Sequence, residues 1–74
     1  MKQLTEKQDA IYRWIFEFII NNHYPPTNRE IGTAFNLAVK GVHDHLKRIE
    51  KKGYIEIVPK IARGIKILEK GKNT

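Results

Sequence analysis

The chain has 74 residues, no cysteine and no serine, and its 14 basic and 8 acidic residues give a formal net charge of +6. Its length fits one small domain. The missing cysteine excludes disulfides, thiol chemistry and cysteine-bound metals, and the missing serine removes the other common nucleophile, so we expect no enzyme. No stretch approaches the ~20 apolar residues of a membrane span, and the start lacks the apolar run of a signal peptide, so we expect a cytoplasmic protein without membrane contact.

The first predicted element is a helix over about residues 6–22. Thr5 and Gln8 have the spacing of a capping box, in which each side chain accepts a hydrogen bond from the other residue's backbone N–H. The apolar residues cover most of its circumference. We expect the helix to pack between other elements, because apolar helix surface is usually buried in its own domain. The alternative is that its apolar surplus contacts a partner protein. That surplus is Tyr12, Phe16 and Ile20.

A proline pair separates this helix from the next. Pro25 and Pro26 forbid its continuation, and Thr27 and Glu30 form a second capping box that opens a helix over about 28–35. Asn36 follows at the position where a helix often ends in a left-handed residue. The predicted buried edge of this short helix is Ile31, Ala34 and Phe35.

A third, basic helix is predicted over about 39–52, ending before Gly53. Its apolar stripe is Val39, Val42, Leu46 and Ile49. Residues 54–58 and 65–68 are rich in β-branched residues and predict two strands of a hairpin around the loop 60–64. Residues 1–69 form the expected domain, and 70–74 form a polar tail or the start of a linker to an absent C-terminal domain.

This order of elements predicts a mainly α fold with a small β-hairpin, the winged helix-turn-helix. The charge is distributed unevenly along it. The first 37 residues hold four basic and four acidic residues, so the whole net charge of +6 lies in the second half. A basic half on a neutral scaffold suits a phosphate-rich partner, and we expect sequence-specific binding to double-stranded DNA. The recognition helix (about 39–52) would enter the major groove, and the wing loop (about 59–64) would meet the backbone or the minor groove.

The candidate DNA contacts fall into two groups. Residues expected to read or approach base edges are Lys40, Gly41, His43, Asp44 and Lys47. Residues expected to hold the DNA backbone are Thr27, Asn28, Arg29, Arg48, Lys60 and Arg63.

Some of these residues have plainer interpretations. Asp44 has the spacing to pair with Lys40, Lys47 or Arg48 instead of a base. Gly41 is otherwise a weak helix position, and Thr27 a plain cap. We expect no metal site, because His43 and His45 are two residues apart and point to different sides of a helix. The sequence also has no acidic cluster and no glycine-rich phosphate loop, and we expect no cofactor.

Several segments together resemble a known family. They are Met1-Lys2-Gln3-Leu4-Thr5, Pro25-Pro26-Thr27 with Glu30-Ile31, His45-Leu46-Lys47, Lys52-Gly53-Tyr54-Ile55-Glu56-Ile57 and Arg63-Gly64-Ile65. The chain resembles the amino-terminal DNA-binding domain of the LexA repressor family over nearly its whole length. The resemblance implies a repressor of DNA-damage (SOS) response genes that binds a two-fold operator.

The resemblance also implies a second domain with a self-cleaving Ser–Lys dyad, which acts once an activated recombinase filament forms and is absent from this chain. The homodimer would depend mainly on that domain, so we expect this fragment to be monomeric or weakly dimeric. The chain departs from the family at Ala38, where members usually have a Ser or Thr cap. Its segment Lys40-Gly41-Val42-His43-Asp44 also differs from the corresponding stretch of the best-known enteric member of the family, which is rich in Ala and Glu. The operator that this chain reads therefore need not match the operator of that member. The competing interpretation is a winged-helix protein-interaction module that uses the apolar surplus of the first helix.

Overall fold

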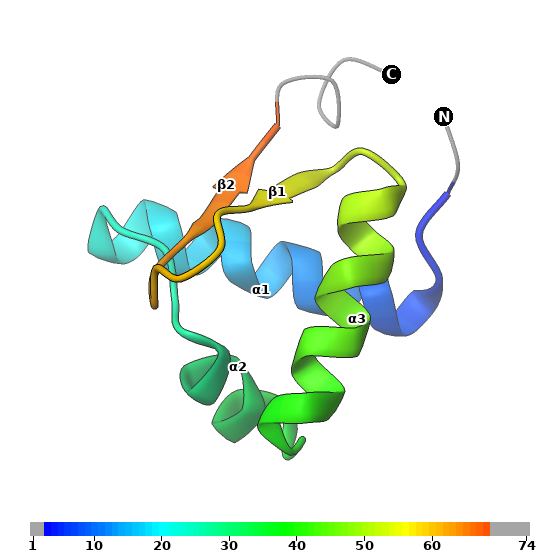
Figure 1. Cartoon of the computed structure of the whole chain (residues 1–74), viewed down its shortest axis with the longest axis horizontal. Helices are drawn as coiled ribbons and strands as arrows, with labels where there is room; N and C mark the ends of the chain where they lie inside the picture. The colour runs from blue at the N-terminus through cyan, green and yellow to red at the C-terminus, as the bar shows by residue number, and fades with distance from the viewer. Residues whose placement is uncertain (1–2, 69–74) are drawn as a thin grey trace.

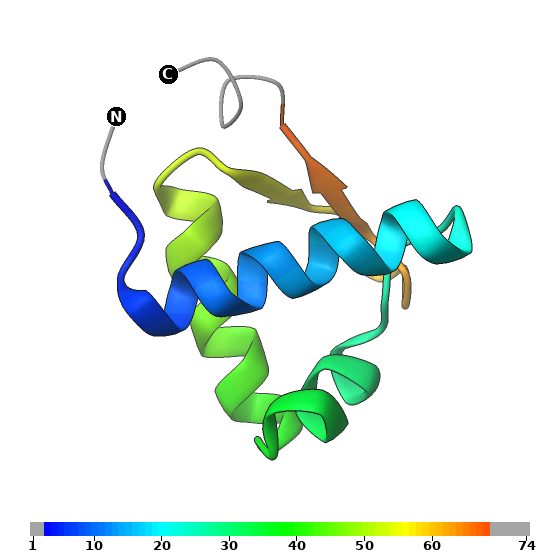
Figure 2. The same ribbon diagram turned by 180° about the vertical axis from the view of Figure 1, so that it is seen from behind.

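A computed structural model describes residues 3–68 of the chain. Within that range three helices precede a two-stranded antiparallel sheet: α1 (Glu6–Asn22), α2 (Asn28–Phe35), α3 (Val39–Lys51), β1 (Ile55–Ile57) and β2 (Ile65–Ile67). Helix α1 crosses α3, and α2 lies beside the amino-terminal half of α3 (Figures 1 and 2). The expected winged helix-turn-helix is confirmed. The tail predicted for 70–74 lies outside the described residues.

Both predicted capping boxes are present. The Thr5 hydroxyl accepts from the Gln8 N–H at 3.2 Å, and the Thr27 hydroxyl accepts from the Glu30 N–H at 3.1 Å. The reciprocal bonds from the Thr5 and Thr27 N–H groups are also made. Asn36 ends α2 in the left-handed region at φ 57°, as predicted. These caps satisfy backbone donors and acceptors that helix ends otherwise leave free.

Helix α3 begins without a side-chain cap. Ala38 has the extended backbone of an N-cap, with φ −67° and ψ 154°, but its methyl group can accept no hydrogen bond. The helix ends at Lys51, one residue earlier than expected, and Gly53 follows with φ 93°. The uncapped start leaves room for a stabilising substitution.

We therefore expect Ala38→Thr to stabilise the domain by about 1 kcal/mol, because a hydroxyl there can accept from the first turn of α3. For a domain of this size that corresponds to a rise in the melting temperature of about 4–8 °C. Thermal unfolding followed by circular dichroism measures it. Ala10→Thr, at an exposed position inside α1, is the matched control and should lower the melting temperature slightly. An unchanged or lower value for Ala38→Thr would contradict the assignment of the cap.

One apolar cluster holds the elements together. It consists of Ile11, Ile15, Ile31, Val42, Leu46, Ile49, Ile55 and Ile65, each at most 5% exposed. The predicted stripe of α3 is confirmed for three of its four members. Val39 is the exception, because it lies at the first turn of α3 and is 48% exposed.

The predicted buried edge of α2 needs a correction. Ile31 is buried and Phe35 is half-buried, but Ala34 is exposed. Gly32 is buried instead, because the chain between α2 and α3 passes directly over it. A Cβ added at Gly32 would lie 2.5 Å from the Leu37 carbonyl oxygen. The close approach of this turn, which spacing alone does not reveal, decides which face of α2 is covered.

The hairpin is shorter than predicted. Its register pairs Ile55 with Ile67, Glu56 with Lys66 and Ile57 with Ile65. Beyond these pairs, single hydrogen bonds run from the Val58 N–H to the Gly64 carbonyl and from the Leu68 N–H to the Tyr54 carbonyl, at 2.6 and 3.1 Å. They extend the pairing toward the predicted ends without forming further strand. We call β1, β2 and their connecting loop the wing.

The apolar surplus of α1 is partly used inside the domain. The Tyr12 ring packs edge-on against Tyr54 with centroids 5.5 Å apart, and Phe16 lies 6.5 Å from Tyr12. Burial raises the pKa of the Tyr12 phenol. Ile20, in contrast, is 59% exposed. Within residues 3–68 no helix combines the length and the apolar character needed to cross a membrane.

Candidate nucleic-acid interface

The exposed face of α3 gathers most of the predicted base-reading residues. Val42, Leu46 and Ile49 point into the core, which turns the opposite face of the helix outward. That face carries Lys40, His43, Asp44 and Lys47, all exposed, together with Arg48 and Lys51. Four of these six side chains are lysine or arginine. An α-helix fits the major groove of B-DNA, which is about 12 Å wide.

Gly41 lies beside this face and leaves it open. The residue is half-buried, and a Cβ added to it would meet nothing within 4 Å. The protein's own packing therefore does not require glycine here.

The acidic residue of the exposed face is Asp44. Asp44 forms no ion pair with Lys40, Lys47 or Arg48 within the described part of the chain. Lys47 pairs instead with Glu50, with its Nζ 3.3 Å from Oε1. The plainer interpretation of Asp44 as an intrahelical ion-pair partner is thus not realised.

Glu50 links α3 to the wing, a role that the sequence analysis missed. Its Oε2 accepts from the Ile57 N–H at 2.9 Å while Oε1 faces Lys47. The hydrogen bond from Ile57, and then the contact with Lys47, lower the pKa of the Glu50 carboxyl. One carboxylate therefore holds strand β1 against α3 and orients a candidate base-reading lysine.

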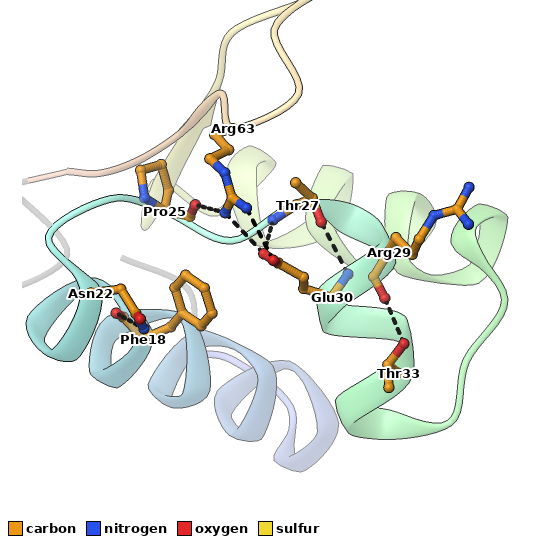
Figure 3. A network of polar contacts seen from close by, with 8 residues as sticks. All are labelled: Phe18, Asn22, Pro25, Thr27, Arg29, Glu30, Thr33 and Arg63. Carbon is orange, nitrogen blue, oxygen red and sulfur yellow. Dashed lines mark hydrogen bonds and ion pairs between the residues drawn. The ribbon is translucent and has the colours of Figure 1, made fainter.

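The start of α2 supplies further candidates for backbone contact. The Thr27 hydroxyl oxygen accepts the capping hydrogen bond from the Glu30 N–H, which confirms that Thr27 caps α2. Asn28 is half-buried, and Arg29 is exposed and points away from Glu30 (Figure 3). The first N–H groups of a helix suit an anionic oxygen, so Asn28 and Arg29 flank a favourable place for a phosphate.

A groove of about 430 Å³ lies between α3, the start of α2 and the wing. Predicted residues from all three elements line it. His43 and Lys47 come from α3, Asn28 from α2 and Lys60 from the wing. Exposed Lys60 has φ 67°, in the left-handed region. The structure thus brings together candidates from both groups, whereas Arg48 lies on the flank of α3 nearer to Gln8 and Lys52.

Arg63 is the predicted residue whose surroundings differ most from expectation. Its guanidinium does not project freely from the wing. Nη1 donates to the Pro25 carbonyl at 2.8 Å and to Glu30 Oε1 at 2.9 Å, and Nη2 donates to Glu30 Oε2 at 3.0 Å. The group also stacks over the Tyr24 ring, 4.5 Å from its centroid. Figure 3 shows Arg63 reaching from the wing to the first turn of α2.

These contacts shift both ionisation equilibria toward the charged forms. The hydrogen bond from Arg63 is the main cause that lowers the pKa of the Glu30 carboxyl, and the same bond raises the pKa of Arg63. Both groups are therefore charged near neutral pH.

The histidines form no metal site within residues 3–68. No group of three or more potential ligands comes together there. The Nδ1 atom of His45 is buried and makes no hydrogen bond within the described structure, whereas His43 is exposed. The two rings therefore lie in different surroundings, as their spacing predicts.

Comparison with known proteins places these features in a family. Residues 1–64 match the family described as the LexA DNA binding domain. The chain is 46% identical over 69 residues to the LexA repressor of Leptospira biflexa serovar Patoc, covering 93% of this chain and 34% of that protein. It is also 46% identical over 69 residues to the LexA repressor of Staphylococcus aureus strain Newman, covering 92% of this chain and 33% of that protein. The chain thus spans about a third of the length of these relatives.

Proposed function

Since this chain belongs to the LexA DNA binding domain family, we propose that it binds double-stranded DNA sequence-specifically as the DNA-binding part of a repressor of DNA-damage (SOS) response genes. The observation that carries the proposal is the exposed cationic face of α3, which continues through the groove to Lys60 of the wing. A helix in the major groove with a wing beside it matches that surface.

We assign base contacts to the exposed face of α3. Lys40 donates to guanine O6 and N7, and unpaired Asp44 accepts from cytosine N4. His43 and Lys47 line the groove and face base edges or the adjoining phosphates. Gly41 allows the helix backbone to approach the DNA.

Backbone contacts surround this face. Thr27, Asn28 and Arg29 present the start of α2 to one phosphate, and Lys60 reaches another from the wing. Arg48 holds a phosphate on the opposite flank of α3. Binding to the chromosome would place the protein at the bacterial nucleoid.

The proposed operator is two-fold, with a homodimer formed by the longer protein and this fragment monomeric or weakly paired. Self-cleavage and the response to an activated recombinase filament would belong to a part of the protein beyond this chain. Selection of bound sites from random duplexes tests the proposal. A shared half-site sequence is expected, and a palindrome with half-sites about 34–36 Å apart, or a multiple of it, would also support two-fold use. Recovery of no shared sequence would contradict specific binding.

Gly41→Ala offers a test in which stability and binding change in opposite directions. The free protein has space for the methyl group, so we expect a gain of about 0.5–1 kcal/mol in the free energy of unfolding. If DNA approaches the backbone at this point, the same methyl group weakens binding to the selected duplex. Thermal unfolding and a binding titration measure the two effects. A stabilised variant with undiminished affinity would remove Gly41 from the DNA contacts.

A further inference from the structure

We propose that Arg63 and Glu30 are positioning residues that fix the wing for DNA binding, and that Arg63 acts through Lys60 instead of contacting a phosphate itself. The inference rests on the proposed DNA binding and deepens it. We call the contacts of Arg63 with Glu30, Pro25 and Tyr24 the clasp.

The clasp joins parts of the chain that are distant in sequence. Arg63 lies 33 residues from Glu30 and 38 from Pro25, yet it bonds to both. Its two bonds to Glu30 are parallel and bidentate, a geometry that fixes the planar guanidinium in one orientation. Tyr24 covers its face. The wing is therefore held in both distance and orientation against the first turn of α2.

The connecting loop of the wing needs such an anchor. The strands are held by Ile55 and Ile65 in the core, but they pair over only three residues each. The hydrogen bond from the Ile57 N–H to Glu50 holds the end of strand β1 against α3. Residues 59–62 of the loop, in contrast, are exposed. Arg63 immediately follows that loop and is the residue through which its far side is tied to α2. A loop held in place before binding loses less conformational entropy when DNA arrives.

The same contacts make Arg63 a poor phosphate ligand. Three of the five N–H donors of its guanidinium are used by protein oxygens. Its positive charge is paired with Glu30 at 2.9 Å. Lys60, three residues earlier, is exposed, lines the groove and is the free cation that the clasp positions.

Glu30→Gln separates the two roles of Arg63 because they predict opposite signs. Gln at this position still accepts the capping bond from Thr27, so α2 keeps its start. If the clasp positions the wing, the variant binds a short mixed-sequence duplex more weakly, by up to about eightfold at 0.1 M salt, the value of one released counterion. If Arg63 instead contacts phosphate, removing its carboxylate partner frees the cation, and binding becomes tighter.

Two further variants complete the experiment. Arg63→Lys keeps the charge but loses the bidentate geometry, so it should weaken binding about as much as Glu30→Gln. Glu56→Gln is the matched control, because Glu56 is an exposed wing carboxylate opposite Lys66 and outside the clasp. It should bind as wild type does or slightly more tightly. In the Glu30→Gln background, Lys60→Ala should lose most of its effect.

Hydrogen exchange without DNA gives a second measurement. The Val58 N–H, bonded to Gly64 across the loop, should exchange faster in Glu30→Gln and Arg63→Lys than in Glu56→Gln. Unchanged exchange, or tighter binding by Glu30→Gln with wild-type binding by Arg63→Lys, would overturn the inference while leaving the proposed function intact. If the wild-type chain itself shows no salt-dependent binding, the proposed function fails and the inference falls with it.

Discussion

Raising the salt concentration from 50 to 200 mM is expected to weaken DNA binding by about 40-fold. Arg29, Arg48 and Lys60 are the exposed cations assigned to phosphates, and each releases about 0.9 counterion on binding, so the slope of log K against log salt is about −2.7. Base-edge contacts add little to this slope. Titration of a labelled duplex at several salt concentrations measures it.

Two lysine variants calibrate the salt response. Lys60→Ala should reduce the magnitude of the slope by about 1, because it removes one phosphate contact. Lys52→Ala is the matched control, since its ammonium donates to the Gln3 carbonyl and to Gln8 Oε1, at 3.0 and 2.7 Å. It should leave the slope nearly unchanged. A binding constant that barely responds to salt would favour the competing interpretation, a protein-interaction module.

Lys40→Ala is expected to weaken binding to the selected site by about 1–3 kcal/mol, or about 5- to 150-fold, while affinity for random DNA falls much less. The reason is geometric. Lys40 is exposed at the first turn of α3, and the amino-terminal residues of a recognition helix are those that reach base edges. Parallel titrations with the selected duplex and a shuffled one measure the difference.

Lys60→Ala serves as the comparison for this specificity effect. Because the wing lysine is assigned to a phosphate, its loss should weaken both duplexes about equally. A Lys40→Ala variant that also loses equal affinity for both would remove Lys40 from the base-reading group. Sequence specificity would then depend on the other residues of the base-reading group.

The features that sequence predicted well are those set by neighbours along the chain. The caps at Thr5 and Thr27 depend on residues three positions apart, and the buried stripe of α3 depends on helical periodicity. The left-handed Asn36 follows from its place after the last turn of α2. For these elements local chemistry and the final fold agree.

The features that sequence missed depend on distant partners. Nothing near Glu30 in the chain indicates that its carboxylate, besides capping α2, also accepts two hydrogen bonds from Arg63. Glu50 likewise has a helical partner in Lys47, but its bond to the Ile57 N–H requires the wing to fold back on α3. The exposure of Ala34 and Val39 reflects the limits of the contact between α2 and α3, which periodicity does not define. The clasp changes how Arg63 is assigned, because a basic residue in a wing loop suggests a free cation.

The tight crossing at Gly32 has a consequence for how this domain tolerates mutation. Since a Cβ at this position would lie 2.5 Å from the Leu37 carbonyl oxygen, any other residue must displace the turn that joins α2 to α3. Such a variant would keep every side chain of the proposed DNA-binding surface, and we expect it still to misalign α3. Loss of operator recognition can therefore arise at a buried residue that never meets a nucleotide, through misalignment of an otherwise intact surface.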